Sequence, residues 1–90
     1  MNDQAKWLIN WFVDRGNSIP GNTQEQLQVN YFEAGLIDSL GVIELIADIE
    51  RHFRIYFNER HFQERRFSTI GGLSNLIAEI ITSNKETGEF

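Results

Sequence analysis

Apolar residues near the start of the chain recur with helical spacing. In DQAKWLINWFVDRG, Leu8, Trp11 and Phe12 stand at i, i+3 and i+4, the spacing of one helical face. The Asn and Asp at residues 2–3 are candidate N-caps, and Gly16 can end the helix in a left-handed turn. The pattern therefore predicts an amphipathic helix.

The next stretch, residues 16–37, contains turn signals and no sustained period. Pro20 and Gly21 favour a turn, and so does Gly35. Its apolar residues, which can anchor it to a core, are Leu27, Val29, Tyr31 and Phe32. Loops of about twenty residues are uncommon in compact domains and are often functional. We predict a long loop that leads to Ser39.

From Ser39 to about Phe53 the helical pattern is strong. Asp38 precedes it as an N-cap, and Ile37 can pack on Val42 as a hydrophobic staple. At about 100° per residue, five apolar side chains fall in one stripe that we expect to pack against the first and last helices. They are Val42, Leu45, Ile46, Ile49 and Phe53.

Leu40, Ile43 and Ala47 lie outside this stripe and form a second strip on the same helix. One interpretation is that a neighbouring loop covers the second strip. The other is a docking patch rimmed by charge, the usual anatomy of a transient interface. We expect the second, because Glu44 and Arg51 beside the strip are residue types that rarely tolerate full burial.

Two further helices follow. Asn58 can cap a short one, with Phe57 and Phe62 in staple geometry around it. The last is predicted to begin near Ser68 or Thr69. Its apolar positions are Ile70, Leu73, Ile77, Ile80 and Ile81.

These elements predict an all-α fold. No segment alternates with period two for long enough to indicate a strand. We expect a small four-helix bundle, with three longer helices plus one short helix and a long loop between helices 1 and 2. A single domain is expected over residues 1–84, because 90 residues suffice for one small core. The polar residues 85–90 are expected to form a flexible C-terminal tail.

Composition narrows the class of protein. The chain has no cysteine, so neither disulfides nor thiolate metal sites stabilise it. Its apolar runs fall far short of the roughly 20 residues that span a bilayer, and the N-terminus lacks the regions of a signal peptide. We expect a soluble cytoplasmic protein.

The charge of the chain is unevenly placed. Its formal net charge is −5, and residues 21–50 carry six acids without one Lys or Arg. Residues 51–66 hold five arginines, a density more typical of a solvated helix surface than of a nucleic-acid groove. Nucleic acid is therefore not an expected partner.

Ser39 invites comparison with hydrolases, but its surroundings do not fit. A nucleophile elbow requires G-x-S-x-G on a strand-to-helix turn, whereas LIDSLG has Ile37 at the first glycine position and no strand before it. The histidines, His52 and His61, lie on other predicted faces, so a catalytic triad and a metal site are both disfavoured. An ordinary first-turn serine remains an alternative.

The stretch FEAGLIDSLGVIELIADIERHF resembles the attachment region of acyl carrier proteins, in which D-S-L opens the second helix. FEAGLIDS, with a glycine two residues after the serine, is similar to the D-alanyl carrier branch and other stand-alone carriers more than to the fatty-acid type. Residue matching is confined to about 32–53, although the order of elements agrees along nearly the whole chain. The resemblance implies a 4′-phosphopantetheine arm, transferred from coenzyme A to Ser39.

The resemblance also implies roles for the neighbouring residues. Asp38 would cap the helix and be read by the transferase, and Leu40 would adjoin the arm. Partner recognition would fall to Leu40, Ile43, Glu44, Ala47, Asp48 and Arg51. Two residues depart from the fatty-acid carriers, which often have an acid at the position of Gly41 and usually keep the stretch around Arg51 acidic. Partners that dock through many basic side chains are therefore expected to bind less well.

The expected function is thus a non-enzymatic, monomeric carrier that holds an acyl or aminoacyl group as a thioester. Its partners would be a phosphopantetheinyl transferase, a loading ligase and a downstream acyltransferase or synthase, in lipid, polyketide, peptide or cell-envelope biosynthesis. The alternative is an unmodified helical interaction module. Aromatic residues make up 12% of the chain and are expected to fill the interior, which favours a short or polar cargo.

Overall fold

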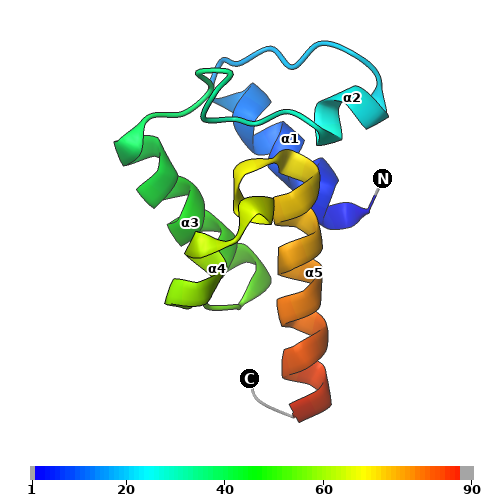
Figure 1. The fold of residues 1–90 in the computed structure, drawn as a ribbon, viewed down its shortest axis with the longest axis vertical. Coiled ribbons are helices and arrows are strands. Elements are labelled where there is room, and N and C mark those ends of the chain that lie inside the picture. Colours follow the sequence, from blue (N-terminus) through cyan, green and yellow to red (C-terminus); the bar gives the residue numbers. More distant parts are fainter. Residues whose placement is uncertain (1, 88–90) are drawn as a thin grey trace.

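The computed structural model describes residues 2–87, with side chains described to residue 84 (Figure 1). The helices are α1 (Asp3–Asp14), α2 (Thr23–Leu27), α3 (Ser39–Phe53), α4 (Glu59–Gln63), a 3₁₀ helix η1 (Arg65–Ser68) and α5 (Ile70–Thr87). In the described part of the chain, β-type pairing is limited to an isolated bridge between Asn30 and Thr69. The predicted all-α class is confirmed, with three longer helices.

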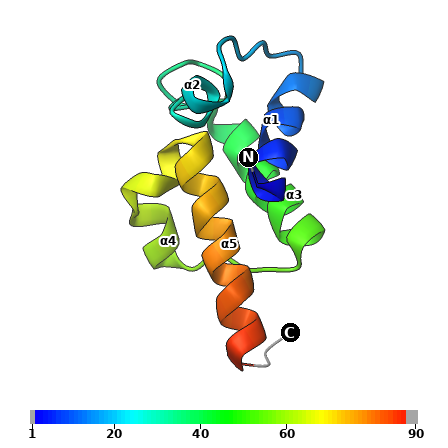
Figure 2. The ribbon, with the colours of Figure 1, turned by 90° about the vertical axis from the view of Figure 1, so that its right-hand side faces the viewer.

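Helix α5 extends from the middle of the molecule to its lower end, and α1 packs against it (Figures 1 and 2). In Figure 2, α4 lies on the other side of α5 from α1. Thr69 caps the start of α5, because its Oγ1 accepts the Gly72 N–H at 3.0 Å. The backbone of α5 continues to Thr87, so the tail expected at residues 85–90 overlaps the helix, and residues 88–90 lie outside the described residues.

Helix α1 forms as its pattern predicts. Asn2 is the N-cap, with its side-chain oxygen accepting the Ala5 N–H at 2.8 Å. Leu8, Trp11 and Phe12 are buried. Gly16 follows the helix with a φ of 91°, a conformation that favours glycine.

The loop between α1 and α3 is more ordered than the sequence predicts, because it contains α2. Asn22 Oδ1 accepts the Glu25 N–H at 3.0 Å, and the Glu25 carboxylate accepts the Asn22 N–H. This capping box, visible in the letters NTQE, was the available signal. The prediction missed it because a five-residue helix shows no apolar period.

Tyr31 fastens the second half of this loop to the start of α5. Its side chain is fully buried, and its hydroxyl donates a hydrogen bond to the Phe67 carbonyl. The Tyr31 N–H donates to the Ser68 carbonyl at 3.3 Å, and the Ile70 N–H donates to Val29 at 3.1 Å. Phe32, also expected as an anchor, is instead 42% exposed. Tyr31 and this backbone pairing therefore hold the second half of the loop, and Leu27 and Val29 pack against the core as expected.

Burial raises the pKa of the Tyr31 phenol above its ordinary value of 10.0. A folded-state pKa above the unfolded value makes stability fall as pH rises past about 10, by up to about 1.4 kcal/mol per pH unit. Tyr31→Phe should therefore lower the free energy of unfolding at pH 7 by about 1–3 kcal/mol, since the Phe67 carbonyl loses its donor. Between about pH 10 and 11 the variant should also lose less stability than the unsubstituted protein, because phenylalanine has no phenol to ionise.

Urea unfolding at pH 7 and across the range from about pH 10 to 11 measures both changes in stability. Tyr56→Phe is the matched control, because its ring is 79% exposed. An alkaline loss of stability in Tyr31→Phe as steep as in the unsubstituted protein would contradict the assignment.

The core stripe of α3 is narrower than predicted. Leu45 and Ile49 are fully buried, whereas Ile46 and Phe53 are only partly buried at the edge of the core. Val42 is half-buried. The side chains that complete the core come mainly from α1 and α5, together with Tyr31, Ile55 and Phe67. The direction of the stripe was predicted correctly, but the burial of Val42, Ile46 and Phe53 was overestimated.

Candidate functional site

The start of α3 presents Ser39 to solvent. Asp38 is the N-cap, with its Oδ1 accepting the Gly41 N–H at 2.7 Å and its carbonyl accepting the Val42 N–H at 3.0 Å. Ser39 is the first residue of the helix and is exposed. Its hydroxyl therefore lies where unpaired first-turn N–H groups and the helix dipole favour an anion.

Gly41 explains one departure from the fatty-acid carriers. A Cβ at this position would lie 2.7 Å from Cγ1 of Ile37, far inside contact distance. The Ile37 side chain therefore lies directly over the first turn of α3, and a larger residue at position 41 would displace it. Glycine here keeps the loop closely packed beside Ser39.

Asn17 ties the loop before Ser39 to the end of α1. Its Nδ2 donates to the Phe12 carbonyl at 3.1 Å and to the Leu36 carbonyl at 3.3 Å. Beside it is an open hollow of about 320 Å³ that reaches the cap of α3. Its lining residues are Trp11, Arg15, Asn17, Gly35, Leu36, Ile37, Asp38 and Gly41. Asn17 was not identified from the sequence, since its bond to Leu36 joins residues 19 positions apart.

The second strip is open to solvent. Leu40 is 65% exposed and Ile43 is 64% exposed, and Ala47 is exposed as well. The interpretation that a loop covers these residues is therefore wrong. Together they form an apolar surface that begins beside Ser39 and follows α3 toward its middle.

The acids beside the second strip are already paired within the chain. Arg15, at the end of α1, contacts Glu44 at 2.6 Å and Asp48 at 3.7 Å. Asp48 also accepts the Trp11 indole N–H at 2.8 Å and lies 3.5 Å from Arg51. Sequence analysis selected Glu44, Asp48 and Arg51 as recognition residues but missed Arg15, which pairs with both acids.

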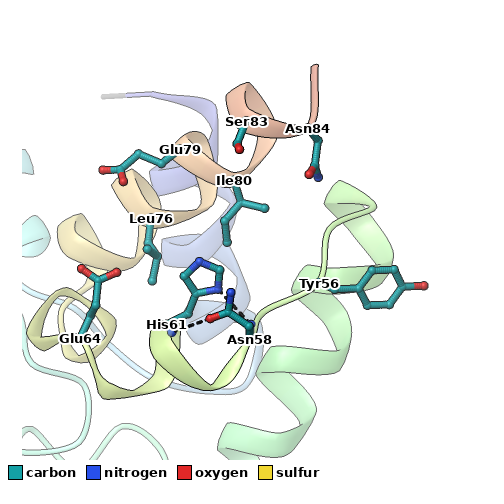
Figure 3. Close-up of a pocket in the computed structure, with 9 residues that line it drawn as sticks. All are labelled: Tyr56, Asn58, His61, Glu64, Leu76, Glu79, Ile80, Ser83 and Asn84. Atoms are coloured by element: carbon teal, nitrogen blue, oxygen red, sulfur yellow. Dashed lines mark hydrogen bonds between the residues drawn. The ribbon is translucent and has the colours of Figure 1, made fainter. Parts of the chain in front are cut away.

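A second hollow, of about 370 Å³, lies between α4 and the C-terminal half of α5 (Figure 3). His61 has a structural role there: its Nδ1 accepts the Asn58 N–H at 3.0 Å and closes a capping box on α4. The Tyr56 ring points away from the other lining side chains (Figure 3). This hollow adjoins the end of α3 opposite Ser39.

The acids of this second hollow are also paired. Arg66 donates to Glu64 at 2.8 Å and to Glu79. The hydrogen bond from Arg66 holds the pKa of the Glu79 carboxyl below its usual value. The network therefore connects the turn after α4 to α5 and leaves these carboxylates committed to structure.

The described side chains give no sign of a metal centre or membrane span. Among them, no group of three or more His, Asp and Glu residues could hold a metal ion. No helix in residues 2–87 is both long and apolar enough to cross a membrane.

His52 stacks on the Trp7 ring, with centroids 5.1 Å apart, near the opposite end of α3 from Ser39.

Comparisons with known proteins find one family model and several curated relatives. Residues 18–77 match the family model described as "Phosphopantetheine attachment site". The D-alanyl carrier protein of Streptococcus mutans serotype c (strain ATCC 700610 / UA159) is 29% identical over 59 residues, which cover 66% of this chain and 75% of the relative. That of Leuconostoc citreum (strain KM20) is 33% identical over 54 residues, covering 59% and 69%. No solved structure shows a significant match.

Proposed function

Since the chain belongs to the phosphopantetheine-attachment carrier family, we propose that it carries an acyl or aminoacyl group on a 4′-phosphopantetheine arm attached to Ser39. The observation that carries the proposal is the exposed Ser39 hydroxyl, placed directly after the Asp38 cap and beside the exposed second strip. An attachment serine must be accessible to the modifying enzyme, and Ser39 is exposed.

The residues at the start of α3 suit a phosphodiester on Ser39. A negative group there lies at the positive end of the α3 dipole, near N–H groups that the helix itself does not use. Asp38 leaves the position accessible, because its carboxylate is committed to the Gly41 N–H. When bound, the arm supplies a terminal thiol that holds the cargo as a thioester. The serine needs no activating base of its own, since the modifying enzyme performs the transfer.

The partners would dock on the second strip and its polar border. A phosphopantetheinyl transferase, a loading ligase and a downstream acyltransferase or synthase must each reach Ser39. Leu40, Ile43 and Ala47 offer them an exposed apolar surface, with Glu44, Asp48 and Arg51 along its edge. In this function the chain is a monomeric, cytoplasmic substrate of these enzymes and performs no catalysis itself.

The filled interior of the bundle favours a short or polar cargo. Phe12 and Tyr31 are fully buried, and Phe67 is 5% exposed, so aromatic rings occupy the space between the helices. The similarity to D-alanyl carrier proteins supports an aminoacyl cargo. We infer that the cargo stays outside the bundle.

Intact-mass spectrometry tests the attachment after incubation with coenzyme A and a broad-specificity transferase. We expect a single phosphopantetheine adduct, lost in Ser39→Ala and retained in Ser18→Ala, which alters an exposed serine of the loop. An adduct that persists in Ser39→Ala would place attachment elsewhere. No adduct with several transferases would favour the unmodified interaction module.

Amide chemical shifts test the cargo position. Between the holo form and a form loaded with a long acyl chain, we expect only small shifts in the core residues of α3 and α5, because close-packed side chains leave no room for the chain. Large shifts at Leu45, Ile46, Ile49 and Leu73 would mean that the acyl chain enters the bundle. Loading with a short aminoacyl group provides the matched control.

A further inference from the structure

The border between α1 and α3 joins two acids, one arginine and one tryptophan. The Arg15 guanidinium lies 4.0 Å from the centroid of the Trp11 ring and contacts both Glu44 and Asp48. The indole N–H of Trp11 donates to the same Asp48 oxygen that Arg15 approaches. Stacking and hydrogen bonding therefore hold the arginine between the two carboxylates.

The cluster remains accessible to a partner. The side chains of Arg15 and Glu44 are 40% and 43% exposed, and that of Asp48 is 32% exposed. Glu44 and Asp48 are one helical turn apart on α3, on the border of the second strip. A protein that docks on the second strip therefore meets these carboxylates with a cation already in place.

This arrangement changes the charge that a partner encounters. Two carboxylates would give this part of α3 a negative surface, but Arg15 pairs with both, and Arg51 also approaches Asp48. The local charge is therefore close to neutral, although the chain as a whole carries −5. The apolar second strip is left as the dominant feature of the surface.

We propose that Arg15 determines which partners this surface accepts. By occupying Glu44 and Asp48, it favours a partner whose docking face is apolar and carries few cationic side chains, and it disfavours one that relies on lysines and arginines. This inference rests on the proposed function, because it takes the second strip as the docking surface. Arg15 acts through its ion pairs with Glu44 and Asp48.

Binding of the apo protein to a phosphopantetheinyl transferase with a basic docking face, measured without coenzyme A, tests the proposal. Arg15→Gln frees the Glu44 carboxylate, while Asp48 keeps its contacts with Trp11 and Arg51. We therefore expect about fivefold tighter binding at about 20 mM salt, as for one unit charge near 4 Å in water. At about 0.5 M salt the gain should shrink below about twofold, because exposed charges are screened. The unsubstituted protein should show a shallower salt dependence than Arg15→Gln.

Two variants separate this role from a change in total charge or in folding. Arg60→Gln removes the same charge from an exposed position on α4, so its salt dependence should match that of the unsubstituted protein. Arg15→Lys keeps a cation near the carboxylates and should restore most of the shallow salt dependence. Circular dichroism at each salt concentration confirms that every variant is folded.

Equal salt dependence in the unsubstituted protein and in folded Arg15→Gln would overturn the proposal. An equally steep salt dependence in Arg60→Gln would also overturn it, because net charge alone would then explain the effect. So would a failure of both the unsubstituted protein and Arg15→Gln to bind the transferase. Failure of the proposed function gives a different result. Ser39 would then take no adduct from any transferase, while the salt dependences of the unsubstituted protein and Arg15→Gln would still differ as expected.

Discussion

Ile43→Asp should leave the protein folded with a melting temperature close to that of the unsubstituted chain, whereas Ile49→Asp, on the same helix, should abolish folding. Ile43 is 64% exposed, so its replacement adds a charge where water already solvates the surface. Ile49 is fully buried among other core side chains, with 0% of its surface accessible to water. One substitution at two positions of α3 therefore gives opposite results.

The expected magnitudes follow from the cost of burying charge. An unpaired carboxylate in a closed core costs at least several kcal/mol, even after its pKa rises and it takes up a proton. A domain of this size has a total stability of about 5–13 kcal/mol, so Ile49→Asp removes most or all of it. Circular dichroism during heating distinguishes the two variants directly.

The same Ile43 variant reports on docking. If the second strip receives the transferase, Ile43→Asp removes an apolar contact and adds a charge at the interface, and conversion of Ser39 should slow by about tenfold or more. Val13→Asp is the matched control, since Val13 is 47% exposed on α1, outside the second strip. It should convert at the normal rate.

Any of three results would contradict this account. A collapsed melt for Ile43→Asp would show that the strip is covered in solution. A normal melt with a normal conversion rate would show that partners dock elsewhere. Equal slowing in Val13→Asp would attribute the effect to charge alone.

The three longer helices could be predicted because their apolar residues repeat over several turns and their ends carry local signals. Asp38 caps α3 as predicted, and Thr69, one of the two residues expected at the start of the last helix, caps α5. The predicted aromatic contact of Phe57 with Phe62 is also present, with ring centroids 5.8 Å apart. Such features depend on residues a few positions apart, which a single sequence displays.

The remaining features depend on contacts between distant segments. Helix α2 is fixed partly by its position against α5: a Cβ at Gly71 would lie 2.9 Å from the Leu27 carbonyl oxygen. His61 takes the place of the usual Glu or Gln in the capping box of α4, so it resembled an ordinary surface residue.

At the candidate site, the capped Ser39 and the second strip were visible in the sequence. Arg15 was not, because its partners Glu44 and Asp48 are far away in the chain and the arginine itself lies at the end of a helix with no special motif. The limits of the α3 stripe were hidden for a similar reason. Periodicity gives the direction of a helical face, whereas the lengths of the covering helices decide where burial stops.

Phe53 and Phe12 illustrate this limit and provide the second large expected effect. The sequence places Phe53 in the core, where truncation to Ala would cost about 3–5 kcal/mol. In the structure the ring lies at the core edge, against Trp7 at 5.4 Å and His52 at 4.7 Å between centroids, and it is only partly buried. Phe12 instead is fully buried between Trp11 and Tyr31.

Phe12→Ala should therefore lower the free energy of unfolding by about 3–5 kcal/mol, because it leaves a closed cavity, and Phe53→Ala by about 1–2 kcal/mol. At about 4–8 °C per kcal/mol, the melting temperatures of the two variants should differ clearly. Val13→Ala, next to Phe12 but half-exposed, should change stability by less than about 0.5 kcal/mol. Equal losses for the two phenylalanines in urea unfolding would mean that the Phe53 ring is enclosed in solution, and that the stripe predicted from the sequence extends to the end of α3.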